Sequence, residues 1–409
     1  MQNCEQRSAQ QMLTPITTFA IAASMRTLIR ADDPNVQFIG RARSGALSGT
    51  LDFDMPGCEI RATIVLNKTS CLSVDFAQMH EPHPNCTSCG NTKNSGYESN
   101  AFVVWINGER QGRGGYNATF VTDVNDALVH SYPLDGSKAT CVTPLPAGTH
   151  SVRVLKATEA DWNGGSPVAN FVTFHGFSVP AAVDGTVAVY AAAPPPRPAR
   201  RIEFLGDSIT AGFCNECKTP PSDPTDHGEA YGASWDHQIC ELLAAECHTA
   251  AWSGLGMVRN CCGGNTTMPT IFEQTLATVT AQGGGTPWDW SKWAADALVI
   301  NLGTNDGGAS TDPAYHYTET YADLVVAASE HYPNVHVFLA CGPMSEHYCD
   351  PVQEVIANVT ARGVKAYFLD QRGYLNGTFG PGCCGHPSIE VDTAMATAGA
   401  AFIKATLGW

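Results

Sequence analysis

The amino-acid sequence predicts an α/β protein in two parts. The expected parts are an N-terminal antiparallel β-sandwich of jelly-roll type and a C-terminal three-layer α/β/α domain with a five-stranded parallel sheet. Short apolar runs separated by turn residues occupy residues 36–189, whereas longer apolar runs alternate with amphipathic stretches in residues 200–409. The first pattern is typical of a sandwich, and the second is typical of a parallel sheet covered by helices.

The sandwich prediction depends on several runs of alternating polarity: 46–53, 59–66, 101–106, 118–121, 150–155 and 170–179. Turn-forming pairs such as Asn107-Gly108 and Asp135-Gly136 lie between such runs. We expect residues 1–35 to be poorly structured, so that the sandwich occupies residues 36–189. Residues 190–199 predict a linker, because consecutive prolines favour extended geometry and do not fit inside a helix or a central strand.

Five apolar runs after the linker predict the parallel strands: 202–205, 249–252, 297–302, 335–340 and 364–369. Residues 231–243, 317–328 and 391–402 each place their apolar side chains on one helical face. Right-handed crossovers bring the loops that follow parallel strands to one edge of the sheet. We therefore expect the catalytic residues to lie in those loops.

Charge and composition narrow the choice of partners. The 409 residues carry a net charge of −16, which repels phosphate backbones and makes nucleic acid a poor partner. A neutral glycan meets no such barrier. No run of about 18 apolar residues occurs, so we expect no membrane span. We also expect the protein to be a monomer.

The 16 cysteines and six Asn-x-Ser/Thr sequons favour secretion, although sequons also arise by chance. The sequons begin at Asn67, Asn85, Asn117, Asn265, Asn358 and Asn376. The short apolar run Ile16–Ala23 is weak for a signal peptide, and no basic leader precedes it.

Ser208 is the candidate nucleophile. It lies in the segment Gly206-Asp207-Ser208-Ile209-Thr210, after the first parallel strand and before a predicted helix. There its hydroxyl would lie at the edge of the sheet, near the positive end of the helix dipole. The alternative is that Asp207 or Ser208 only caps the helix.

Three further loops supply the other parts of an acyl-transfer site. Asn305 follows the third strand and Gly254 follows the second, and with the Ser208 backbone N–H they form a candidate oxyanion hole. Both loops also read as ordinary turns. His386 precedes the last helix and is the candidate general base. Because the chain has 13 histidines, the argument depends on the combination of loops.

This combination resembles the SGNH, or GDSL-type, hydrolase superfamily. Its sequence blocks are matched by Gly206–Ile209, by Gly254, by Gly303-Thr304-Asn305-Asp306 and by His386-Pro387, within residues 200–409. Segments 145–152, 156–159, 174–177, 202–212 and 299–306 further resemble carbohydrate esterase family 2. The resemblance implies removal of acetyl groups from polysaccharides such as acetylated xylan or glucomannan, without a cofactor or metal.

One position departs from the superfamily pattern. Most SGNH enzymes have an aspartate three residues before the histidine, where this chain has Cys383. Family 2 members often lack that aspartate and orient the histidine through a backbone carbonyl, so the resemblance implies a Ser–His dyad. Asp392 is a fallback candidate for orienting His386. We expect Asp207 and Asp306 to organise their loops, and Trp252 to belong to the core rather than to stack on a sugar.

The cysteines allow two interpretations. Cys86 and Cys89, with His80 and His83 nearby, suit a zinc site, but their loop-like segment favours disulfides. Cys214 and Cys217, Cys261 and Cys262, and Cys383 and Cys384 lie in three candidate active-site loops. We predict that disulfides tie these three loops together.

The function that the sequence favours is a secreted serine esterase that deacetylates a carbohydrate. Two alternatives stay open. One is an esterase or lipase for longer acyl chains, and the other is a glycan-binding protein whose hydrolase domain is inactive.

Overall fold

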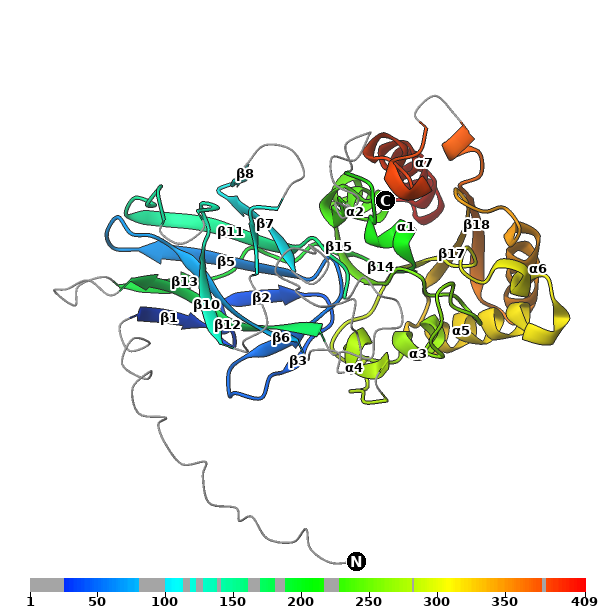
Figure 1. Cartoon of the computed structure of the whole chain (residues 1–409), viewed down its shortest axis with the longest axis horizontal. Coiled ribbons are helices and arrows are strands. Elements are labelled where there is room, and N and C mark those ends of the chain that lie inside the picture. Colours follow the sequence, from blue (N-terminus) through cyan, green and yellow to red (C-terminus); the bar gives the residue numbers. More distant parts are fainter. Residues whose placement is uncertain are drawn as a thin grey trace, which may run out of the picture.

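The fold has two parts, a stack of strands and a sheet flanked by helices (Figure 1). The computed structural model describes residues 26–80, 100–112, 118–122, 128–137, 141–160, 170–180, 188–216, 228–281, 283–376 and 380–409. Among these residues, no helix is long and apolar enough to cross a bilayer.

Two antiparallel sheets form the N-terminal part. One sheet runs β10 (Val129–Pro133), β6 (Ser73–His80), β12 (Asn170–Pro180), β4 (Leu51–Phe53) and β3 (Arg43–Ser44), and β1 (Arg26–Arg30) also pairs with β12. The other runs β13 (Val189–Ala192), β5 (Glu59–Leu66), β11 (Gly148–Lys156), β7 (Ala101–Ile106) and β8 (Glu109–Arg110). In the second sheet, β2 (Val36–Ile39) pairs with β5, and β9 (Phe120–Val121) pairs with β7.

The two sheets pack face to face. Alternate residues of β5, from Ile60 to Leu66, are buried. Phe76 of the first sheet stacks on Phe102 of the second, with ring centroids 4.6 Å apart. These contacts place the apolar faces of both sheets in one core and confirm the predicted antiparallel sandwich.

Two sequence expectations about this part were wrong in detail. Residues 26–30 were expected to be poorly structured, but they form β1 and pair with β12 from Arg26↔Pro180 to Arg30↔Gly176. Their partner lies about 150 residues away, so no local pattern reveals the pairing. At the other end, β13 takes Val189–Ala192, which includes the start of the expected linker. Residues 193–199 belong to neither helix nor strand.

The C-terminal part contains the predicted five-stranded parallel sheet. Its order is β15 (Ala245–Ala251), β14 (Arg200–Gly206), β16 (Ala297–Asn301), β17 (His336–Cys341) and β18 (Lys365–Asp370). Side chains of α2 (Trp235–Leu243) and α7 (Ile389–Leu407) share a buried cluster with Ile202 and Phe204. On the opposite face, Leu298 and Ile300 share a cluster with α5 (Tyr317–His331) and α6 (Cys349–Ala361). The domain therefore has three layers.

Buried polar contacts join the sandwich to the α/β domain. Arg41 lies 2.7 Å from the Glu203 carboxylate of β14, and both side chains are fully buried. Asp54 accepts hydrogen bonds from the backbone N–H and the hydroxyl of Thr278, at the start of α4 (Ala277–Ala281). Because unpaired buried charges are costly, these pairs favour one arrangement of the two parts.

Candidate active site

Ser208 begins the short helix α1 (Ser208–Ala211) at the end of β14. Gly206 is required in the preceding turn, because a Cβ there would lie 2.0 Å from the Thr210 hydroxyl. Asp207 caps the helix by accepting the Ile209 N–H at 2.9 Å, so the capping interpretation holds for Asp207. The Ser208 Oγ lies 2.8 Å from the His386 Nε2. The structure therefore brings the candidate nucleophile and base into contact.

The His386 ring is held by its other nitrogen. Nδ1 lies 3.1 Å from the carbonyl oxygen of Cys384. A carbonyl only accepts, so Nδ1 carries the proton and Nε2 presents a lone pair to the serine hydroxyl. Phe213 packs edge-on against the ring, with centroids 5.1 Å apart. Burial lowers the pKa of His386 below its usual 6.5, although the Cys384 carbonyl opposes this shift. The neutral imidazole that a general base requires is therefore favoured.

A disulfide fixes the carbonyl that orients His386. Cys384 is bonded to Cys214, which lies just after α1. The backbone at Cys384 is left-handed, with φ of +55°, and Gly385 follows with φ of +72°. The segment that carries His386 is thus joined covalently to the loop that follows Ser208.

Asp392, the fallback candidate for orienting the histidine, has other partners. Its carboxylate is buried in α7 and accepts a hydrogen bond from the Asn215 side chain at 3.0 Å. The orienting contact of His386 comes from the Cys384 carbonyl instead. Asp392 therefore holds the loop after α1 through Asn215, and its hydrogen bond is to that side chain rather than to the imidazole.

Asn305 lies between the nucleophile and the loop that contains Gly254. Its Nδ2 donates to the Leu255 carbonyl at 2.8 Å and to the Asp207 carboxylate at 3.2 Å. Gly254 precedes Leu255 and has φ of +82°, which favours glycine. The contacts bring together three of the four loops that the sequence nominated. Both amide hydrogens of Asn305 already have acceptors. To donate to an oxyanion, the side chain must therefore give up its longer hydrogen bond, the one to Asp207.

Asp306 holds the loop that follows β15. Its carboxylate accepts the backbone N–H groups of Met257, Val258 and Arg259 at 2.7–3.0 Å. Burial, with repulsion from the Asp306 carboxylate, raises the pKa of Asp207 to about 7. The two aspartates therefore shape the loops around Ser208, as expected for residues that organise loops.

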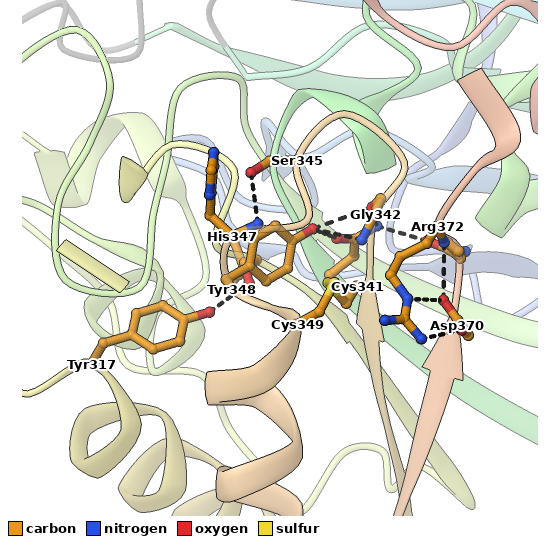
Figure 2. The surroundings of a disulfide bond; sticks show 12 residues. Tyr317, Cys341, Gly342, Ser345, His347, Tyr348, Cys349, Asp370 and Arg372 are labelled. Atoms are coloured by element: carbon orange, nitrogen blue, oxygen red, sulfur yellow. Dashed lines mark hydrogen bonds and ion pairs between the residues drawn. A yellow bond between two sulfur atoms is a disulfide. The ribbon is translucent and has the colours of Figure 1, made fainter. Parts of the chain in front are cut away.

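Two tyrosines support the loop that carries Asn305. A Cβ at Gly303 would lie 2.3 Å from the Tyr348 ring, and the Tyr317 hydroxyl donates to the Leu302 carbonyl at 2.9 Å. Figure 2 shows both tyrosines beside the Cys341–Cys349 disulfide, which joins the end of β17 to α6. Sequence reasoning missed this support, because the two tyrosines come from elements after the loop.

The disulfide prediction was correct for two loops and wrong for the third. Cys214–Cys384 joins the loop after Ser208 to the segment that carries His386. Cys261 and Cys262 bond to each other, so they do not tie the Gly254 loop to its neighbours. Neighbouring cysteines are already close, and Asp306 holds this loop instead.

Two further predictions concern the zinc alternative and the place of Trp252. Cys86, Cys89, His83 and Cys217 lie outside the described residues, so the zinc alternative is not tested. Within the described ranges, no cluster of three or more His, Cys, Asp or Glu residues is arranged to hold a metal. Trp252 is 1% exposed and belongs to the core, as predicted.

Similarity to known proteins agrees with this geometry. Residues 204–387 match the GDSL-like lipase/acylhydrolase family. The chain is 31% identical over 296 residues to the cellulase/esterase CelE of Acetivibrio thermocellus, a match that covers 71% of this chain and 34% of that protein. The chain thus spans about a third of the length of this relative. An acetylxylan esterase / glucomannan deacetylase of Cellvibrio japonicus is 23% identical, with 80% of this chain and 76% of that protein covered.

A solved structure extends the likeness to both parts of the molecule. A family two carbohydrate esterase from Clostridium thermocellum, in complex with cellohexaose, superposes with a TM-score of 0.69 at 26% identity. The superposition covers 91% of this chain and 99% of that chain. The sandwich is therefore part of the shared architecture. This chain carries a domain of the GDSL-like lipase/acylhydrolase family, in a two-part fold that it shares with a family two carbohydrate esterase.

Proposed function

We propose that this protein is a serine esterase that removes O-acetyl groups from a carbohydrate. The observation that carries the proposal is the contact between the Ser208 hydroxyl and a histidine ring whose other nitrogen is bound to a carbonyl. That arrangement generates a nucleophile without a metal or a third charged residue. The relatives are named as esterases, and two of their names specify acetylxylan and glucomannan.

The mechanism uses the residues in two half-reactions. Ser208 Oγ attacks the acetyl carbonyl carbon as His386 Nε2 takes its proton. The tetrahedral oxyanion is bound by the N–H groups of Ser208 and Gly254 and by the Asn305 amide. His386 returns the proton to the sugar oxygen, which leaves as an alcohol. Water then attacks the acetyl-Ser208 ester in the same way and releases acetate.

The Cys384 carbonyl has a defined part in both half-reactions. It keeps the proton on Nδ1 while Nε2 accepts and returns the other proton. When the ring is protonated, the carbonyl dipole also stabilises the positive charge, as an aspartate does more strongly in a triad. We therefore propose a dyad in which the orienting group is neutral.

The substrate and the setting belong to the proposal. A neutral polysaccharide such as acetylated xylan or glucomannan suits a chain with a net charge of −16. Disulfides such as Cys71–Cys141 and Cys214–Cys384 favour a secreted enzyme. We propose that the hydrolase domain begins near residue 200, after the proline-rich segment, and that the enzyme acts as a monomer.

The test is acetate release from acetylated xylan and glucomannan by the full chain. We expect Ser208→Ala and His386→Ala each to reduce turnover by on the order of 10⁴-fold or more. His316→Ala is the matched control, because His316 is exposed and pairs with Glu319. Wild-type rates in either active-site variant would refute the proposal. A series of aryl esters from acetate to octanoate tests the preference for acetyl, and faster hydrolysis of long chains would favour a lipase-like enzyme.

A further inference from the structure

We propose that Glu159 of the β-sandwich is a positioning residue for the oxyanion hole of the α/β domain. The inference rests on the proposed esterase function. It assigns the sandwich a part in catalysis that does not depend on binding a glycan. Glu159 ends the Lys156-Ala157-Thr158-Glu159 segment, which contains none of the catalytic residues proposed above.

The segment after β11, residues 157–159, lies against residues 229–231, which follow α1 in the chain. The Ala157 carbonyl accepts the Tyr231 N–H at 3.0 Å, and the Glu159 N–H donates to the Glu229 carboxylate at 2.6 Å. Between these two partners, the Ala230 N–H lies 3.0 Å from the Asn215 side-chain oxygen. Asn215 directly follows Cys214, the residue whose disulfide holds the His386 segment. One side of the Glu159 segment is therefore connected to the Ser208 and His386 loops.

The side chain of Glu159 reaches the other side of the site. Its carboxylate accepts the backbone N–H of Ser253, the residue directly before Gly254. On the far side of Gly254, the Leu255 N–H donates to the Trp252 carbonyl at 3.2 Å. The Gly254 carbonyl is itself held by the Cys261 N–H at 3.0 Å. The peptide that carries the Gly254 N–H is thus held on both sides, and Glu159 is the contact that the sandwich supplies.

Charge and burial explain how a carboxylate is kept in this place. Glu159 is 4% exposed, and Lys156 is fully buried in the same segment. The Lys156 ammonium donates to the backbone carbonyls of Thr158 and Glu159 at 2.5 and 2.8 Å, which fixes the turn that directs Glu159 towards Ser253. The neighbouring Lys156 charge offsets part of the cost of burying the Glu159 carboxylate. Burial and repulsion from Glu159 raise the pKa of the adjacent Glu229 well above its usual value, which favours the neutral form of Glu229. The segment is therefore held by hydrogen bonds and connects two active-site loops.

Asp54 provides a matched control, because its carboxylate also interacts electrostatically with Lys156 but does not contact the oxyanion loop. Like Glu159, it is a buried sandwich carboxylate that accepts a backbone N–H of the α/β domain. Its partner is Thr278 of α4, which belongs to none of the loops around Ser208. Loss of either carboxylate weakens the contact between the two parts, but only Glu159 touches the oxyanion loop.

The experiment compares the full-length wild type with Glu159→Ala, Glu159→Gln and Asp54→Ala. Turnover of an aryl acetate gives kcat and KM, and thermal unfolding gives stability. Amide hydrogen exchange of peptides that cover residues 252–262 reports on the loop without any need for activity. We expect Glu159→Ala to lower kcat by roughly 10- to 100-fold, because small misplacements of catalytic groups have effects of this size. KM should stay within about twofold, because the lost interaction acts in the transition state.

The control variants decide between positioning and structure. We expect Glu159→Ala to speed exchange in residues 252–262, whereas Asp54→Ala leaves both exchange there and kcat near wild type at comparable loss of stability. Glu159→Gln keeps a carbonyl oxygen for the Ser253 N–H and should recover most of kcat. Unchanged exchange in Glu159→Ala, or an equal fall of kcat in Asp54→Ala, would overturn the inference. An inactive wild type would refute the proposed function instead, and the exchange data would still test the positioning role.

Discussion

The two sides of the candidate site are held in place by different means. On the Ser208–His386 side, the Cys214–Cys384 disulfide fixes a segment whose Cys384 and Gly385 are exposed. On the oxyanion side, hydrogen bonds to the carboxylates of Asp306 and Glu159 hold a loop that is largely buried. Exposed segments gain little from hydrogen bonds that compete with water, whereas buried carboxylates bind N–H groups strongly. The comparison indicates that each side uses the restraint suited to its solvent exposure.

Among the variants that test this comparison, the largest effect should come from Asn305, whose amide contacts both sides of the site. Asn305→Ala removes a proposed oxyanion donor and its bonds to Asp207 and Leu255. We expect kcat for an aryl acetate to fall by about 10²–10³-fold, the usual cost of losing one such donor. Gln353→Ala, on the exposed face of α6, is the control, because it removes an amide side chain without changing a sequon. A loss below about threefold would mean that Asn305 only supports its loop.

A smaller effect is expected when the oxyanion loop loses its main anchor. Asp306→Ala leaves the N–H groups of Met257, Val258 and Arg259 without their shared acceptor. We expect kcat to fall roughly 10- to 100-fold, because the loop loosens but the donors remain. Steady-state kinetics beside a thermal unfolding curve measures this. Wild-type kcat in a folded Asp306→Ala protein would show that the loop does not depend on the carboxylate.

The sequence predicted the parts whose signals are local. Buried apolar runs identified all five parallel strands, and the strand-end motifs nominated Ser208 and His386, whose side chains lie 2.8 Å apart. Helix α6 was missed although its signal is also local, because Val352, Val355 and Val359 recur with helical spacing on one buried face. Strand β1 and the Glu159–Ser253 contact depend on partners about a hundred residues or more away. Asp392 was nominated by proximity in sequence, but the structure pairs it with Asn215, which is 177 residues away.

The disulfide on the His386 side should have a more moderate effect on turnover. In the double variant Cys214→Ser/Cys384→Ser, the Cys384 carbonyl remains but its position is no longer fixed. We expect kcat to fall roughly tenfold, less than the ~10² of a full misplacement. The matched control is Cys240→Ser/Cys247→Ser, which opens a disulfide between α2 and β15. Equal kcat in the two double variants would show that the carbonyl needs no covalent support.

The central claim is that neutral His386 takes the proton from Ser208, and kcat/KM against pH tests it most directly. As pH falls through the pKa of His386, the ring is protonated and the rate must fall. Because burial lowers this pKa, the account predicts an acid limb with its midpoint below pH 6.5. The nearby Asp207 has its pKa raised to about 7. A midpoint near 7 would assign the limb to that carboxyl and contradict the account.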